Sequence, residues 1–182
     1  MKSINLYISY PMLKIRYFCT KLISDFSFFK NFTCMDVKIE KAKPRDFKYI
    51  HALIHEFSDF QNSKDKVSVT VDLMIEQQNY FNCYIAKGPG NQIIGYTNYS
   101  VVYYSWVGKS IYLDDLFVKP AYRGKGIGFS MMNKVFEVAK KENCNRVRWQ
   151  VSKWNTSAIE FYQKIGAEVD DMEMNCDLMI KK

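Results

Sequence analysis

The chain has 182 residues, of which 48% are hydrophobic and 25% charged, as is ordinary for a globular protein of one domain. No apolar run approaches the roughly 18–20 residues of a membrane-spanning helix, so we predict no membrane partner. The net charge of +7 favours an anionic partner. Charge alone does not choose between nucleic acid, a membrane surface and a phosphorylated cofactor.

The first 34 residues differ from the rest. They are rich in aromatic and basic residues, and Asp25 is their single acid. Organelle-targeting peptides have such a composition, but arginine is scarce here and no amphipathic stripe appears. We therefore predict an accessory extension over residues 1–34 and a folded domain over residues 35–182. Five cysteines without C-x-x-C spacing predict reduced thiols and a cytoplasmic protein.

From Met35 onward the apolar pattern becomes regular. In chain order it predicts a strand near 37–39, helices over 44–60 and after Thr70, strands over 82–87, 92–104 and 110–120, a helix from 127, a strand over 145–152, a helix from 156 that Gly166 ends, and a last strand over 173–180. Residues 88–91, Gly-Pro-Gly-Asn, predict a hairpin turn. This order predicts an α/β fold with a mixed, mostly antiparallel sheet flanked by helices.

Residues 122–131, YRGKGIGFSM, form the densest motif. They combine glycines with cations, at Gly124, Gly126, Gly128, Arg123 and Lys125. A loop with few side chains exposes its N–H groups, and the helix that follows adds its positive end, so the segment suits a phosphate or pyrophosphate. The alternative for the glycines alone is a tight turn, although a turn has no need of cations.

Two other kinds of site are disfavoured. His51 and His55 lie one helical turn apart, but the stretch lacks the glutamate of H-E-x-x-H and the chain has no third histidine, so we predict no metal. The aromatic residues lie mostly at core spacing and do not interleave with lysine and arginine on one face, which argues against nucleic acid.

The glycine motif also carries a resemblance. YRGKGIG matches the R/Q-x-x-G-x-G/A signature of GNAT-type acetyltransferases through Arg123, Gly126 and Gly128. More widely, residues 106–128 and 151–169 resemble the diamine acetyltransferase group of that superfamily, the spermidine/spermine and thialysine N-acetyltransferases. The resemblance extends from Met35 to the C-terminus and is strongest between 106 and 167. It implies the GNAT fold.

The resemblance implies acetyl-CoA as cosubstrate. The pyrophosphate would bind the glycine loop and helix start, at Arg123, Gly124, Lys125, Gly126, Ile127, Gly128 and Phe129. The pantetheine arm would pair with the strand at Leu116, Phe117 and Val118. Asn155 matches a residue that hydrogen-bonds the cofactor in the family.

For catalysis, the resemblance implies that Asp114 is the general base, acting through a water molecule, although relatives commonly carry glutamate there. Asp114 and Asp115 are neighbours in a strand, so alternation predicts that they point to opposite faces. The resemblance also implies that Tyr162 returns a proton to the CoA sulfur. Its helical spacing alone would favour a core tyrosine. We predict direct transfer in a ternary complex.

The acceptor is predicted to be a small amine. The resemblance places Phe60, Gln61, Tyr104, Trp106 and Asp114 at the substrate. Gln61 and Tyr104 are neutral where polyamine-specific relatives carry acids, which favours thialysine or a lysine analogue over spermidine. The alternatives are a protein-lysine or N-terminal acetyltransferase and a non-catalytic CoA-binding regulatory module. A homodimer is implied by the resemblance alone.

Overall fold

The computed structural model describes residues 36–170. The chain divides into two compact units, with residues 36–150 in the larger and residues 151–170 in the smaller. The predicted extension over 1–34 and the predicted strand over 173–180 lie outside the described residues.

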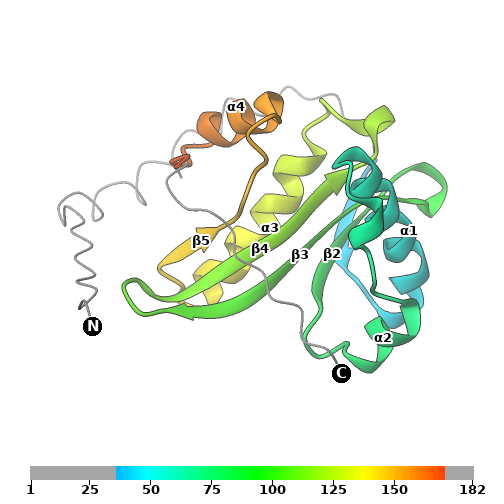
Figure 1. Ribbon diagram of the computed structural model, residues 1–182, viewed down its shortest axis with the longest axis horizontal. Helices are drawn as coiled ribbons and strands as arrows, with labels where there is room; N and C mark the ends of the chain where they lie inside the picture. The colour runs from blue at the N-terminus through cyan, green and yellow to red at the C-terminus, as the bar shows by residue number, and fades with distance from the viewer. Residues whose placement is uncertain (1–35, 171–182) are drawn as a thin grey trace, which may run out of the picture. The chain divides into compact units, whose positions relative to one another are not determined.

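The larger unit contains a five-stranded sheet whose order follows the chain (Figure 1). Its strands are β1 (Lys38–Lys41), β2 (Asn82–Lys87), β3 (Ile93–Tyr104), β4 (Gly108–Val118) and β5 (Arg146–Arg148). The pairs β1–β2, β2–β3 and β3–β4 are antiparallel, and β4–β5 is parallel. The mostly antiparallel sheet is therefore confirmed. Strand β5 is shorter than predicted, since it ends at Arg148.

Helices cover both faces of this sheet. They are α1 (Phe47–Phe60), α2 (Val71–Glu76) and α3 (Ile127–Lys141). Tyr96 and Phe117 point toward α1 and α2 and form a core with Phe47, Ile50 and Leu53. We call this side of the sheet the α1 face, and Figure 1 shows α3 passing behind the strands on the other side.

The α3 side has a core of its own. Val118, the neighbour of Phe117, packs with Ile94, Ile127 and Met131. Because successive side chains of a strand point to opposite faces, the end of β4 contributes to both cores. The position of the loop after β4 is thus fixed by packing on both sides of the sheet.

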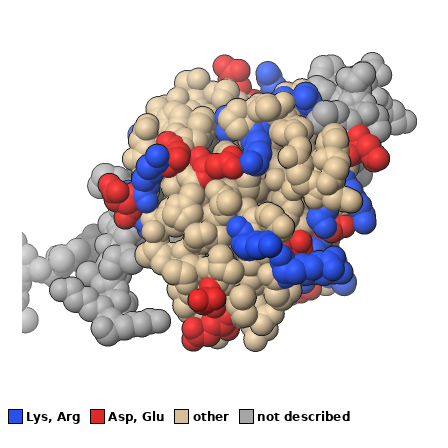
Figure 2. Space-filling model, turned by 90° about the vertical axis from the view of Figure 1, so that its right-hand side faces the viewer, with Lys and Arg blue, Asp and Glu red and all other residues tan. Residues whose placement is uncertain are grey.

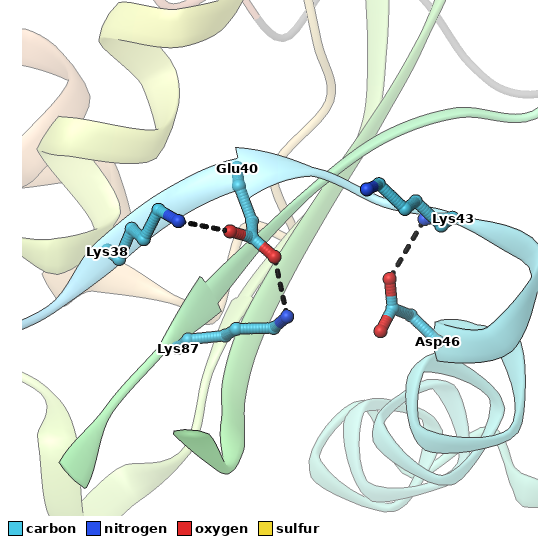
Figure 3. Close-up of polar contacts among 5 residues, drawn as sticks. All are labelled: Lys38, Glu40, Lys43, Asp46 and Lys87. Atoms are coloured by element: carbon cyan, nitrogen blue, oxygen red, sulfur yellow. Dashed lines mark hydrogen bonds and ion pairs between the residues drawn. The ribbon is translucent and has the colours of Figure 1, made fainter. Parts of the chain in front are cut away.

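Ion pairs of Glu40 stabilise the edge of the sheet at β1 (Figure 3). Glu40 pairs with Lys87 at 2.5 Å and with Lys38 at 2.9 Å. These two lysines lower the pKa of Glu40 to about 2. At the start of α1, the carboxylate of Asp46 accepts the N–H of Lys43 at 2.9 Å. The contacts fix the entry into α1 and the β1–β2 register.

The smaller unit contains α4 (Thr156–Lys164). The side chain of Asn155 accepts the N–H of Ala158 at 3.3 Å, so the predicted cap is confirmed. Gly166 follows the helix with φ 86°, a conformation that glycine adopts without strain, and this confirms the predicted stop. Within residues 36–170, none of the helices has the length and apolar character needed to cross a membrane.

Candidate active site

The glycine loop connects β4 to α3. Gly124 and Gly126 have φ values of 73° and 76°, in the left-handed region, and Gly126 is the N-cap residue immediately before α3. The N–H of Ser130 donates to the carbonyl of Gly126. The N–H groups of the turn before Ser130 point out of the helix end, as in any α-helix. A β-carbon built at Gly124 or Gly128 would meet nothing within 4 Å, so the loop has an open side that an anion can approach.

Arg123 braces this loop. Its guanidinium carbon lies 4.5 Å from the ring centroid of Phe60 and 5.6 Å from that of Phe117. Its Nε–H donates to the carbonyl of Val118 at 2.8 Å. Burial lowers the pKa of Arg123. The sequence predicted that Arg123 would bind an anionic ligand. The structure adds that Arg123 connects the loop to the end of β4 through this hydrogen bond.

Lys125 is an exposed residue of the loop. Its Nζ donates to the carbonyl of Ala121 at 3.2 Å and lies 5.5 Å from the ring centroid of Tyr122. Figure 2, which views the side that carries α1 and α2, shows lysine and arginine among acidic side chains, without one continuous basic field.

Strand β4 has an open edge beside the loop. Strand β5 pairs with β4 only through Ser110, Ile111 and Tyr112. Within residues 36–150, β4 then continues over 114–118 with no strand paired on that side. The N–H groups of Asp115 and Lys119 point toward β3. Alternation along an antiparallel strand therefore directs the N–H of Leu116 toward the open edge.

The residues of the predicted pantetheine strand thus have different surroundings. The carbonyl of Val118 also points toward the open edge, but it already accepts a hydrogen bond from the Nε–H of Arg123. Phe117 is buried, and its ring lies 5.4 Å from Phe57 and 6.4 Å from Tyr96, centroid to centroid. Leu116 is therefore the residue whose backbone is best placed for an extended ligand.

A β-bulge lies at Asp114. Asn98 pairs with Asp115, and the next residue, Tyr99, pairs with Leu113, so Asp114 has no partner of its own in β3. The side chain of Asn98 spans the irregularity: its Nδ2 donates to Oδ2 of Asp114 at 3.2 Å, and its Oδ1 accepts the N–H of Asp115 at 3.0 Å.

The bulge changes the expected direction of the two carboxylates. The hydroxyl of Tyr96 donates to Oδ2 of Asp115 at 2.8 Å, while Asn98 contacts Asp114. Tyr96 and Asn98 are two residues apart in β3 and so share a face. Both carboxylates are therefore held from the α1 face. Simple alternation, which predicted opposite faces, is wrong here because the bulge inserts one residue.

The two carboxylates differ in burial. Asp114 is exposed, whereas Asp115 is half-buried. Burial, followed by the charge of Asp114, raises the pKa of Asp115 to about 6, although the Tyr96 hydrogen bond acts in the opposite direction. A carboxyl group with such a pKa exchanges protons close to neutral pH.

The predicted substrate residues fall into two groups. Phe60 and Gln61 lie at the end of α1, where Phe60 contacts Arg123. Tyr104 and Trp106 lie at the β3–β4 turn, at the opposite end of β4. Gly108 and Phe117, the β4 residues beside the two groups, are nine positions apart, or about 30 Å along the strand. Within residues 36–150, the two groups are not brought together.

Sequence reasoning missed Tyr96 and Asn98 at this site. Tyr96 and Asn98 were read as part of an ordinary strand, and only their pairing with β4 shows their contacts with Asp114 and Asp115.

Two predicted residues belong to the smaller unit. Tyr162 lies in α4 and is 8% exposed, and burial raises its pKa to about 12. It therefore stays protonated at neutral pH. The side-chain oxygen of Asn155 caps α4 and also accepts the hydroxyl of Ser157 at 3.2 Å.

A cavity of about 600 Å³ lies elsewhere, at the β1 edge. Glu40, Lys87 and the start of α1 line it, and none of the predicted site residues does. Its acids are already engaged, Glu40 with two lysines and Asp46 with a backbone N–H (Figure 3). We attribute these charges to the structure of the edge.

Comparisons with known proteins agree with this geometry. A family model described as the acetyltransferase (GNAT) family matches residues 47–167. Thialysine N-epsilon-acetyltransferase of Sus scrofa is 34% identical over 142 residues, which cover 72% of this chain and 84% of that protein. Spermidine/spermine N(1)-acetyltransferase-like protein 1 of Homo sapiens is 34% identical over 146 residues, covering 74% of this chain and 21% of that protein.

Solved structures share the fold. An aminoglycoside acetyltransferase from an uncultured soil metagenomic sample, in complex with trehalose, superposes with a TM-score of 0.67 at 20% identity. The alignment covers 84% of this chain and 99% of that one.

Proposed function

Since this chain belongs to the GNAT family of acetyltransferases, we propose that it transfers the acetyl group of acetyl-CoA to the primary amine of a small diamine or lysine analogue. Its relatives place it in the diamine acetyltransferase group, so it is an N-acetyltransferase. Thialysine is the preferred acceptor in this proposal, over spermidine. The similarity to the thialysine N-epsilon-acetyltransferase of Sus scrofa and the neutral side chains of Gln61 and Tyr104 support that preference.

The observation that carries the proposal is the open edge of β4 beside an open glycine loop. Leu116 directs backbone groups to an edge that no strand of residues 36–150 occupies, and the loop that follows has room at Gly124 and Gly128. These features fit an extended amide chain that ends in a pyrophosphate. Bound acetyl-CoA would supply an activated acetyl thioester at this edge.

The carboxylates at the bulge would manage the acceptor's proton. An alkyl amine with a pKa of about 10 is mostly protonated at neutral pH and must lose a proton before or during attack. In the proposal Asp114, which is exposed, takes this proton through a water molecule. Asp115, with its pKa of about 6, lies beside it and can exchange protons with it.

The remaining roles belong to Leu116 and Tyr162. The N–H of Leu116 would polarise the thioester carbonyl, as backbone donors do in acyl transfer. The Tyr162 hydroxyl would protonate the departing thiolate, and its pKa of about 12 keeps that proton available. Transfer would be direct, within a ternary complex and without a covalent enzyme intermediate. The chain is further proposed to form a homodimer.

The test is turnover by the purified full chain with acetyl-CoA. The acceptors would be thialysine, lysine, putrescine, spermidine and a lysine-containing peptide. We expect the highest kcat/KM with thialysine and a large loss of kcat in Tyr162→Phe. A higher kcat/KM with spermidine would refute the acceptor preference, and one with the peptide would favour a protein acetyltransferase. CoA binding without turnover on any amine would favour a regulatory module.

A further inference from the structure

We infer that Phe60 is a positioning residue for the cofactor, which acts by holding the guanidinium group of Arg123 where this group can bind the pyrophosphate. The inference rests on the proposed use of acetyl-CoA. The resemblance places Phe60 at the acceptor amine, whereas the contacts of its side chain lie on the cofactor side of the site.

The end of α1 is fixed against the end of β4. Glu56 of α1 forms an ion pair of 2.7 Å with Lys119, the residue that follows β4. The ring of Phe57 lies 5.4 Å from that of Phe117, centroid to centroid. The ring of Phe60 lies 6.5 Å from that of Phe57, with an interplanar angle of 20°. The last turn of α1 therefore holds Phe60 beside the start of the glycine loop.

The contact with Phe60 leaves the hydrogen-bonding edge of Arg123 available. The guanidinium carbon lies 4.5 Å from the ring centroid of Phe60, and such a contact uses the face of the guanidinium group. Its five N–H donors lie in its plane. The Nε–H donates to the carbonyl of Val118, whereas the Nη donors have no hydrogen-bond partner within residues 36–170.

An arginine that is already fixed binds an anion more tightly than a mobile one. A contact with two phosphate oxygens requires one orientation of the guanidinium plane, and a long side chain loses rotational freedom when it adopts that orientation. In Arg123, the ring of Phe60 and the hydrogen bond to Val118 restrict the group before a ligand arrives. Phe60 would thus increase the affinity for the cofactor without touching it.

The alternative role for Phe60 is direct contact with the acceptor amine. Phe117, whose ring also lies near Arg123, is three positions from Asp114, or about 10 Å along β4. Phe60 is therefore beside the glycine loop and not beside the proposed base. The two roles predict different kinetic effects: loss of cofactor positioning raises the KM for acetyl-CoA, and loss of an acceptor contact raises the KM for the amine.

The first measurement is calorimetric titration of the purified full chain with CoA, without an amine. For Phe60→Leu, which removes the ring, we expect the Kd for CoA to rise on the order of 3- to 30-fold, as when a cation–π contact is lost. Dephospho-CoA retains the pyrophosphate, so its affinity should fall by the same factor. Phe60→Tyr keeps the ring and should bind CoA like the wild type.

Tyr49→Leu is the matched control. Tyr49 lies in the first turn of α1, is 53% exposed, and has the Nζ of Lys48 at 4.8 Å from its ring centroid. The change removes a similar contact at the other end of the helix and should leave the affinity for CoA unchanged. In an Arg123→Ala background, Phe60→Leu should cause little further loss, because the ring acts through the arginine. An undiminished loss in that background would overturn the inference.

Steady-state kinetics separates the inference from the acceptor role and from the proposed function. In Phe60→Leu the KM for acetyl-CoA should rise, with kcat and the KM for thialysine little changed. A higher KM for thialysine with unchanged CoA affinity would overturn the inference. If no amine is acetylated but Phe60→Leu still weakens CoA binding, the proposed function fails and the inference stands. Phe60 is 36% exposed, and Phe60→Met replaces the leucine variant if that one does not fold.

Discussion

Asp115 shows how one carboxyl group can be set apart from its neighbour. Its side chain accepts the hydroxyl of Tyr96 and is half-buried, and its pKa rises to about 6. An acid whose folded pKa lies above its unfolded value binds protons more tightly in the folded state. The stabilising contribution is complete below the unfolded pKa, near 4, and is lost as the pH rises through 6.

The first prediction follows from that sign. Asp115→Asn removes a charge that is unfavourable above pH 6 and keeps an oxygen for Tyr96. We expect the free energy of unfolding at pH 8 to rise by up to about 3 kcal/mol over wild type, with the gain shrinking toward pH 4. Urea unfolding across this range measures it. Asp65→Asn, at an exposed acid, is the control. A gain that does not depend on pH would contradict the assignment.

Arg123 carries the second prediction. Its guanidinium group lies near the rings of Phe60 and Phe117, and its Nε–H donates to Val118. Lysine keeps the charge but cannot reproduce the planar stack or the Nε hydrogen bond. We expect Arg123→Lys to lose about 1–2 kcal/mol of stability without CoA. Urea unfolding of the CoA-free protein tests this prediction. If Arg123 only bound phosphate, the substitution would leave the free energy of unfolding unchanged.

At the scale of the element, the bulge in β4 and the start of α3 determine the site. The bulge leaves Asp114 without a partner in β3 and lets Asn98 contact both neighbouring aspartates. The start of α3 needs left-handed backbone at Gly126, whereas Gly128 is an ordinary helical residue with open space beside it.

Gly128→Ala should therefore separate stability from binding, which is the third prediction. Alanine is the better helix former, so we expect thermal stability without CoA to rise by an amount equivalent to about 0.5–1 kcal/mol. The added methyl group enters the space proposed for the pyrophosphate, so CoA should stabilise the variant less than the wild type. Thermal unfolding with and without CoA measures both. If CoA stabilised the variant as much as the wild type, the proposal that this loop binds the pyrophosphate would be rejected.

Asn98→Ala is the fourth prediction, and it tests the bulge. The substitution leaves the N–H of Asp115 without its acceptor and Asp114 without its donor. We expect kcat to fall by on the order of tenfold, because the two carboxylates lose their fixed positions, while the KM for acetyl-CoA changes little. Steady-state kinetics with acetyl-CoA varied at saturating amine test this. A KM effect without a kcat effect would show that the bulge serves cofactor binding.

At the scale of the whole molecule, the long β3–β4 hairpin leaves apolar side chains exposed. Val101 and Tyr103 are 47% and 78% exposed and lie two residues apart, on one face of β3. A surface of this kind suits contact with a second copy, in which the same patch is used by both subunits. This is the physical support for the proposed homodimer.

The fifth prediction is that this hairpin face holds the dimer together. Wild-type protein should elute as a dimer, and Tyr103→Glu should shift it toward monomer by burying a charge at the contact. Size-exclusion chromatography with light scattering measures the mass. Tyr80→Glu is the control, because Tyr80 is 82% exposed in the segment before β2. Dimers that persist in Tyr103→Glu would place the interface elsewhere.

The local sequence was sufficient for most of the elements. The 3.6-residue and 2-residue periods located α1, α3 and the strands β2 to β4 closely, because each element buries one face and its pattern reports that face. The glycines predicted the loop, since left-handed backbone at Gly124 and Gly126 favours glycine. The resemblance to acetyltransferases, carried by the same segment, is confirmed by the family match.

Only the tertiary structure decided how the site is arranged. Asn98 and Asp115 are 17 residues apart, and the bulge that joins them exists only in the pairing of β3 with β4. The convergence of Arg146 on Tyr104 likewise depends on strand order. Local periodicity records which side of an element is buried, but it carries no record of which distant residue lies opposite. The loop could therefore be predicted from the sequence alone, whereas the arrangement of the paired carboxylates required the packed sheet.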